Sequence, residues 1–138
     1  MRANLLGALG LLLLCAVAVL SALLEVLLVP LRDGTWLVPV AVLFALAGNV
    51  ALPRLARAFV DTTAAMAAAF LSWLLPVLIL ALTPRPEGDV LIRAGAGEQW
   101  VFYGVLLGGA VAGTATLVLH GAPRPGSSGP AARLPTPD

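Results

Sequence analysis

The sequence predicts an all-α integral membrane protein, a four-helix bundle whose two termini both lie on the cytoplasmic side. Of its 138 residues 60% are hydrophobic and only 11% are charged, whereas a soluble domain is about 45–50% apolar and about 25% charged. Four apolar stretches are each long enough to cross a bilayer as a helix. Arginines near the ends of these stretches are more frequent on one side than on the other, and this bias sets the orientation.

The first predicted span covers residues 5–29 and is apolar apart from Ser21 and Glu25. It exceeds the roughly 20 residues that a helix needs to cross the hydrocarbon core. Its start also fits a cleaved secretory signal, although the apolar run continues past the usual length of a signal core. One helix face, expected to point inward, is marked by residues that recur at steps of four and three: Gly7, Leu11, Leu14, Ala18, Ser21 and Glu25.

A short turn and a second span are predicted to follow. Residues 30–35 contain Asp33 and Gly34, which favour a tight turn, so the first two helices are expected to form an antiparallel hairpin. The second span is predicted over residues 36–52. Small residues in this span allow a neighbouring helix to approach closely, and Asn49 is expected to form a hydrogen bond across that contact. The small residues are Ala41, Ala45 and Gly48.

Residues 53–63 form a polar break with two arginines, Arg54 and Arg57, between the second and third apolar runs. We expect a cytoplasmic loop here. The third span is predicted over residues 64–82, capped by one of the polar residues that precede it. Within that span Pro76 removes a backbone hydrogen bond and is expected to kink the helix, which makes it the best hinge candidate. Trp73 lies mid-span and is expected to pack inside the bundle rather than to bind a ligand.

The longest connection, residues 83–99, is expected to face outward, with one short strand at residues 89–92. The fourth span is predicted over residues 100–119. It carries two GxxxG patterns that let another helix approach closely, from within the chain or from a second copy; their glycines are Gly104, Gly108, Gly109 and Gly113. Residues 121–138 are rich in Pro, Gly and Ser and are predicted to be a disordered cytoplasmic tail outside the four-span domain of residues 1–120.

Glu25 is the only acidic residue inside an apolar run, and such a residue is a functional-site hypothesis. Its position near the end of the span also allows a structural role, in which the carboxylate reaches the outer interface or pairs with an arginine. We expect the outer loop to fold over the mouth of the bundle, so that Arg93 or Arg32 neutralises Glu25. Proton or cation handling and partner binding stay open as alternatives.

Several function classes are not indicated by the sequence. No catalytic motif of the common hydrolase, metalloprotease or phosphate-binding types is present, so we expect neither an enzyme nor a bound cofactor. A net charge of +1 without a basic stripe argues against nucleic acid as a partner. The single cysteine, Cys15, allows no disulfide within the chain and no thiolate metal site, and the lone His120 is expected to serve the helix end.

The stretch PRPEGDVLI, followed by the aromatic start of the last span, resembles an actinobacterial family of small four-helix membrane proteins of unknown function. The stretches LAGNVALPRLA and LSWLLPVLIL are similar to that family as well. The resemblance covers residues 5–119, and RPEGD is its most specific part. It implies the four-helix architecture and carries no activity, ligand or catalytic residue onto this chain.

The sequence therefore leaves two functions open for a multi-pass protein of the plasma membrane. The first is a non-enzymatic protein that packs with itself or serves as an accessory subunit of a larger membrane complex. The second is a subunit of a small oligomeric transporter coupled to protons or other cations, with Glu25 as the coupling group. Small multidrug transporters also have four helices and an acid in the first helix, but their acid is farther from the outer end and their outer loop is shorter.

Overall fold

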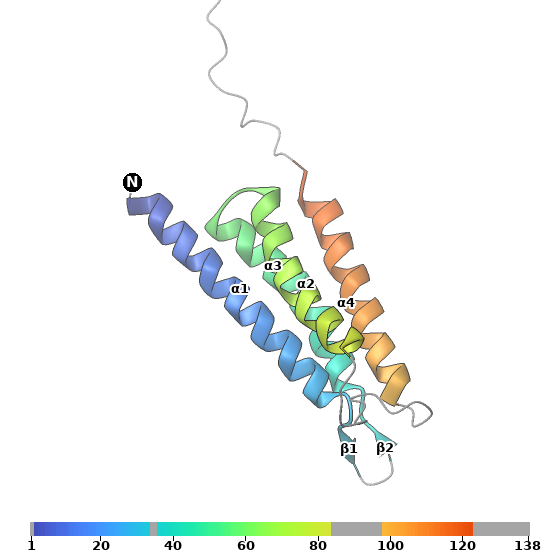
Figure 1. Ribbon diagram of the computed structural model, residues 1–138. Coiled ribbons are helices and arrows are strands. Elements are labelled where there is room, and N and C mark those ends of the chain that lie inside the picture. Colours follow the sequence, from blue (N-terminus) through green and yellow to red (C-terminus); the bar gives the residue numbers. More distant parts are fainter. Residues whose placement is uncertain (1, 34–35, 84–97, 123–138) are drawn as a thin grey trace, which may run out of the picture.

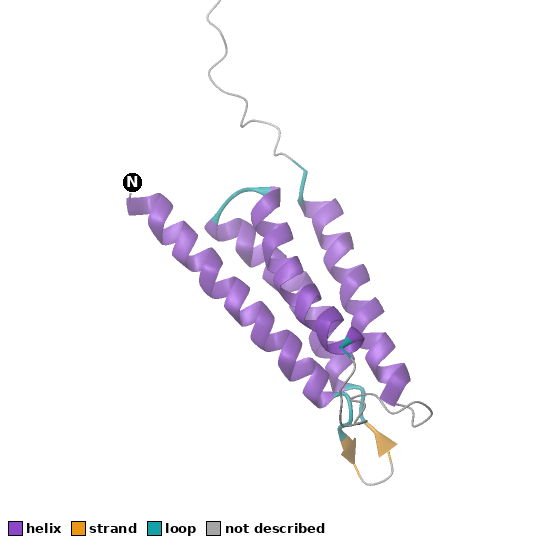
Figure 2. Ribbon diagram, viewed as in Figure 1, coloured by secondary structure: helices purple, strands orange, loops and turns teal. Residues whose placement is uncertain are grey.

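A computed structural model of the chain describes residues 2–33, 36–83 and 98–122. Figures 1 and 2 show four helices in this part of the chain: α1 (Arg2–Leu28), α2 (Val40–Phe59), α3 (Thr63–Leu82) and α4 (Glu98–His120). Two very short strands, β1 (Arg32–Asp33) and β2 (Trp36–Leu37), pair antiparallel between α1 and α2. The strand predicted at residues 89–92 and most of the predicted tail lie outside the described residues.

The helices pack as a bundle in which α1 and α4 flank the central pair α2 and α3 (Figure 1). The start of α1, the α2–α3 connection and the end of α4 all lie at one end of the bundle, and the β1–β2 ladder lies at the other. Each helix contains a stretch long and apolar enough to cross a membrane. The predicted all-helical class with four such helices is therefore confirmed for the described residues.

The inward face of α1 also agrees with the sequence pattern. Leu14, Ala18 and Glu25 are buried, whereas Leu12 and Leu13, just before Leu14, are exposed. Side chains three and four positions apart lie on one face of a helix, and this face packs against α2 and α3. The apolar outer face of α1 is left on the surface of the bundle.

The predicted break at residues 53–63 is too long, because α2 continues through Pro53 to Phe59 and α3 begins at Thr63, so that residues 60–62 form the connection. At its other end α2 begins at Val40, four residues later than the predicted start at residue 36. Pro39 precedes it and suits the start of a helix, because proline has no backbone N–H to leave unpaired. Pro53 gives up one backbone hydrogen bond, but it is buried, and a transmembrane helix tolerates proline where neighbouring elements surround it. The two arginines thus belong to the last turns of α2.

The start of α3 matches the predicted capping. The Thr62 side chain accepts a hydrogen bond from the Ala65 backbone N–H at 3.2 Å, which satisfies one of the free donors at the helix start. Farther along, α3 is one helix through Pro76. The proline side chain is half-buried, and its proposed role as a hinge stays a prediction.

Two glycines of α4 allow this helix to lie close to α2. A Cβ atom added at Gly104 would come within 2.9 Å of Val42, and one at Gly108 within 3.4 Å of Leu46. Both neighbours are side chains of α2, so the first GxxxG pattern serves a contact within the chain.

The other two glycines of α4 make room for aromatic rings of α3. A Cβ atom at Gly109 would overlap the indole of Trp73, and one at Gly113 would overlap the ring of Phe70. These two rings stack, with 6.4 Å between their centroids. The aromatic side chains therefore fill the space that the glycines leave open, and the fit between α3 and α4 depends on it.

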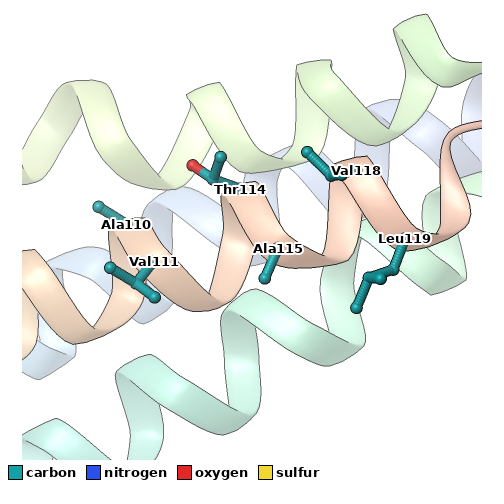
Figure 3. Close-up of a pocket in the computed structure, with 6 residues that line it drawn as sticks. All are labelled: Ala110, Val111, Thr114, Ala115, Val118 and Leu119. Carbon is teal, nitrogen blue, oxygen red and sulfur yellow. The ribbon is translucent and has the colours of Figure 1, made fainter.

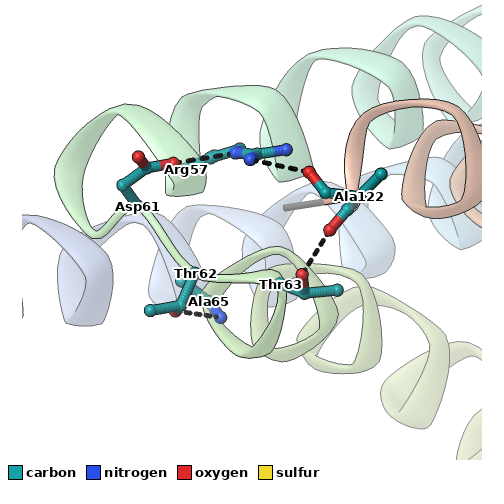
Figure 4. Close-up of polar contacts among 7 residues, drawn as sticks. Arg57, Asp61, Thr62, Thr63, Ala65 and Ala122 are labelled. Carbon is teal, nitrogen blue, oxygen red and sulfur yellow. Dashed lines mark hydrogen bonds and ion pairs between the residues drawn. The ribbon is translucent and has the colours of Figure 1, made fainter. Parts of the chain in front are cut away.

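Polar contacts tie the end of α4 to the connection between α2 and α3 (Figure 4). The Arg57 guanidinium donates to Asp61 at 2.9 Å and to the carbonyl of Ala122 at 3.1 Å. The Thr63 hydroxyl donates to the carbonyl of Gly121. The first two residues of the predicted tail are thus held against the bundle, because residues from two other elements bind their carbonyls.

Overpacking at Gly109 tests the fit between α3 and α4. We expect Gly109→Val to destabilise the protein by about 1–3 kcal/mol, since the added atoms must displace the Trp73 ring. Gly108→Ala is the matched control. Its added methyl group makes an ordinary contact with Leu46, so its thermal midpoint in detergent is expected to stay within a few degrees of the wild-type value. Equal midpoints for both variants would contradict this account.

Candidate functional site

Glu25 lies one turn from the end of α1, yet its side chain is only 1% exposed. The Cα–Cβ bonds of a helix tilt toward its N-terminus, so the side chain reaches back into the bundle and meets Trp73, near the middle of α3. The expectation that this carboxylate reaches the outer interface is therefore wrong. Glu25 is a buried group of the bundle core.

Each carboxylate oxygen of Glu25 accepts one hydrogen bond from a neutral donor. The Ser21 hydroxyl donates to Oε1 at 2.8 Å, and the Trp73 indole N–H donates to Oε2 at 2.7 Å. Trp73 is fully buried, and an indole N–H can only donate, so the carboxylate satisfies a donor that would otherwise be unpaired. The bond from Trp73 joins α1 to α3 through the core, whereas the bond from Ser21 lies within α1.

Asn49 of α2 brings an unpaired acceptor into the same core. Its Nδ2 donates to the carbonyl of Ala45 on the same helix at 2.9 Å, so the predicted hydrogen bond across to another helix is wrong. Its Oδ1 is buried and has no hydrogen-bond partner in the described part of the chain. Pro53, four residues later, has no N–H to donate to the Asn49 backbone carbonyl. Acceptors therefore outnumber donors around Asn49.

The indole of Trp73 connects these two polar groups. Its Nε1 donates to Glu25, and the Cζ2–Cη2 side of its six-membered ring packs against Gly109. A Cβ atom on Gly109 would also lie 3.0 Å from Asn49 Nδ2, which places the amide near the same side of the ring. On the α2 side, a Cβ atom on Gly48 would lie 3.8 Å from Glu25 Oε1. We call Ser21, Glu25, Asn49 and Trp73 the core polar cluster.

The predicted arginine partner of Glu25 is not among the side chains that the structure describes. Arg93 and the rest of the outer loop lie outside the described residues, and the side chain of Arg32 is likewise outside them. The described arginine side chains, Arg54 and Arg57, belong to the last turns of α2, at the opposite end of the bundle from the end of α1. Pairing of Glu25 with an outer arginine stays a prediction.

The core polar cluster has the chemistry of a proton-binding site. Glu25 is its one titratable group, and both of its oxygens are held by hydrogen bonds. When protonated, a carboxyl group becomes a donor that needs an acceptor, and the unpaired Asn49 Oδ1 lies in the same core. Within the described residues no group of three or more His, Cys, Asp and Glu side chains is placed to hold a metal ion.

The role of Trp73 as the partner of Glu25 was missed by the sequence interpretation, although a signal for it was present. A tryptophan in the middle of an apolar span must find an acceptor for its N–H, and Glu25 is the only acid inside an apolar run. A buried donor and a buried acceptor each cost free energy when left unpaired. Pairing the Trp73 N–H with the Glu25 carboxylate would therefore have been a sound prediction.

Comparisons of the chain with protein-family models, with curated proteins and with solved structures find no match. The RPEGD stretch that carries the family resemblance lies at residues 85–89, outside the described part of the structure. The geometry of the core polar cluster is therefore the basis for a functional proposal.

Removing the indole N–H tests the Glu25–Trp73 bond. We expect Trp73→Phe to lower the free energy of unfolding by about 1–3 kcal/mol, since it leaves a buried acceptor without its donor. Trp100→Phe is the control, because Trp100 is 79% exposed and its loss should cost less than about 0.5 kcal/mol.

Combining Trp73→Phe with Glu25→Gln separates the bond from the loss of ring volume. The two changes are expected to be non-additive by about 0.5–3 kcal/mol, because Trp73→Phe removes the donor of the bond and Glu25→Gln replaces its carboxyl acceptor with an amide. Additive effects would show that the two side chains are not coupled.

Proposed function

We propose that this chain is a non-enzymatic, multi-pass protein of the plasma membrane that acts as a subunit of a proton-coupled membrane assembly. In this proposal Glu25 binds and releases the proton. The single observation that supports it is the burial of the Glu25 carboxyl in the bundle core, where its described partners, Ser21 and Trp73, are both neutral.

The physical reason lies in the cost of a charge in a low-dielectric interior. Burial of an ionised carboxylate costs several kcal/mol or more unless a cation or several hydrogen bonds compensate it. Two neutral donors compensate part of this cost in the ionised state, and uptake of a proton removes the charge altogether. A group balanced in this way between two states is suited to coupling a proton to a change in helix packing.

A second candidate is a passive accessory protein that packs with itself or within a larger complex. It is favoured by the close fit of Trp73 against Gly109, since a rigid core of this kind lets the Glu25–Trp73 bond act only as a structural link between α1 and α3. In that case Glu25→Gln should change the stability of the protein without changing any proton-linked property.

The orientation proposed for the bundle places both termini in the cytoplasm. It is supported by the arginine bias and by the common end that the start of α1 shares with the end of α4 (Figure 1). Single cysteines introduced at Ser128 and Gly95 should then react with membrane-impermeant reagents from opposite sides, Gly95 from outside intact cells. Labelling of both positions from outside would contradict this orientation.

The Trp73 indole offers a direct readout of proton binding at Glu25. In a variant with Trp36→Phe and Trp100→Phe, Trp73 is the remaining tryptophan. We expect its fluorescence to change with pH in a single-proton transition, because protonation of the carboxyl alters the group to which the indole N–H donates.

The same variant carrying Glu25→Gln is the control and should show no transition. Proteoliposomes then test the function itself, and proton-linked flux that depends on Glu25 is the expected result. A pH-independent Trp73 signal in both proteins, with no flux, would reject proton coupling and favour the passive accessory role.

A further inference from the structure

The outer face of α4 carries a shallow apolar groove of about 560 Å³ (Figure 3). The side chains that line it are Ala110, Val111, Thr114, Ala115, Val118 and Leu119. One of them is polar and none is charged, so the groove offers little chemistry by which a ligand could be recognised. The chemistry for binding a ligand lies instead in the core polar cluster, on the side where α1 meets α2.

Gly48 of α2 leaves a small space beside the Glu25 carboxyl. A Cβ atom on Gly48 would lie 3.7 Å from Ser21 Oγ and 3.8 Å from Glu25 Oε1. Apart from atoms of α2 near Gly48, no other atom of the described residues lies within 4 Å of that position. The atoms of α1 that face this methyl-sized space are therefore both oxygens.

Both oxygens have the capacity to bind a further group. The Ser21 hydroxyl donates its hydrogen to Oε1 of Glu25, which leaves the lone pairs of the hydroxyl oxygen available. Oε1 accepts that bond, whereas the Trp73 indole donates to Oε2, and each carboxylate oxygen can accept two bonds. Trp73 thus occupies Oε2 and leaves Oε1 directed toward Gly48.

Asn49 adds a third oxygen to this part of the core. Its Oδ1 is buried and has no partner among the residues that the structure describes. The Glu25 carboxyl approaches the Trp73 ring at Nε1, and the Asn49 amide approaches it near Cζ2, two bonds away. A buried carbonyl oxygen without a donor costs free energy, and a cation would remove that cost as a donor would.

The charge and the size of the site determine which cation it suits. Hard cations prefer oxygen ligands, and the three oxygens here are those of a hydroxyl, a carboxylate and an amide. An ionised Glu25 carries one negative charge, and its described partners are neutral. A monovalent cation balances this charge, whereas a divalent cation would leave a net positive charge in the low-dielectric core. The small space beside Gly48 favours sodium over the larger potassium.

We propose that the core polar cluster binds one sodium ion in the space beside Gly48, in exchange for the Glu25 proton. The ligands are Ser21 Oγ, Glu25 Oε1 and Asn49 Oδ1. The proton leaves as the ion binds, so the charge of the core stays the same. Ser21 and Gly48 are half-buried, so the site is nearest the surface of the bundle at the contact between α1 and α2. This inference rests on the proposed function, since Glu25 must release its proton in the folded bundle.

Fluorescence of Trp73 tests this site in the full-length chain that carries Trp36→Phe and Trp100→Phe. The protein in mild detergent is titrated with sodium chloride, and choline chloride keeps the ionic strength constant. We expect sodium to change the signal at lower concentrations than potassium chloride does. The apparent sodium affinity should fall about tenfold for each unit of decreasing pH once the proton competes for Glu25.

Gly48→Ala fills the space for the ion without disturbing the fold. Its methyl group would make ordinary contacts with the two oxygens of α1, so the pH-dependent Trp73 signal should remain while sodium binding weakens at least about tenfold. Gly108→Ala is the matched control, because it adds the same methyl group on α4 beside Leu46. Both the pH response and the sodium response should be unchanged in that control.

The ligands are tested by removing them one at a time. Glu25→Gln keeps the shape of the side chain but removes its charge, so sodium should no longer bind. Ser21→Ala and Asn49→Ala should each weaken sodium binding about tenfold or more. The thermal midpoint of each variant without sodium shows whether the bundle is folded, and Gly48→Ala keeps the test decisive if a ligand variant does not fold.

Three results would overturn the proposal. A Trp73 signal that responds to pH but not to sodium would reject the ion site and leave proton coupling at Glu25 in place. A sodium response that is independent of pH, or that Gly48→Ala leaves unchanged, would place the ion elsewhere on the protein. Absence of both responses would reject sodium binding and proton coupling together.

Discussion

The hydrogen bond from Trp73 to Glu25 is the interaction on which the rest of the described structure depends. Among the described side chains it satisfies the one buried indole donor and the one buried acid at the same time, and it joins α1 to α3. Without it the bundle would contain a buried carboxyl and a buried donor, each with a desolvation cost of a few kcal/mol. The position of the indole in turn determines where α4 needs a residue without a side chain.

The glycines of α4 are a consequence of that constraint. Gly109 lies against the Trp73 ring and Gly113 against the ring of Phe70, so these positions cannot carry side chains without moving the aromatic residues of α3. The same face of α4 brings Asn49 of α2 close to the indole. Helices α1, α2 and α4 thus approach one tryptophan of α3. We expect a change in the charge of Glu25 to alter the packing of each of them.

The helix dipole accounts for the cations at one end of the bundle. Arg54 and Arg57 occupy the last turns of α2, where cations are favoured by the helix dipole. Arg57 is used to hold the chain after α4, whereas Arg54 is left exposed beside His120. If the bundle spans a membrane, this end is the one suited to an anionic leaflet.

The four helices and the inward face of α1 could be predicted from the sequence, because apolar length and a helical period are local properties. The extent of α2 could not, since whether Pro53 ends a helix depends on the elements packed around it. The partner of Asn49 also depends on packing. A hydrogen bond to another helix was expected, yet the side chain donates to the Ala45 carbonyl of its own helix. The partner of Glu25 comes from 48 residues away, and only the packing of α1 against α3 brings it within reach.

Infrared spectroscopy of the carboxyl group itself tests the central claim most directly. In membranes, the wild-type protein with isotopically labelled glutamate should show a protonated-carboxyl band that appears and disappears with pH, and Glu25→Gln should abolish it. A Glu87→Gln variant, which keeps Glu25, should retain the band. A Glu25 carboxyl that stays in one protonation state across the whole pH range in which the bundle is folded would contradict the proposal that it binds and releases a proton.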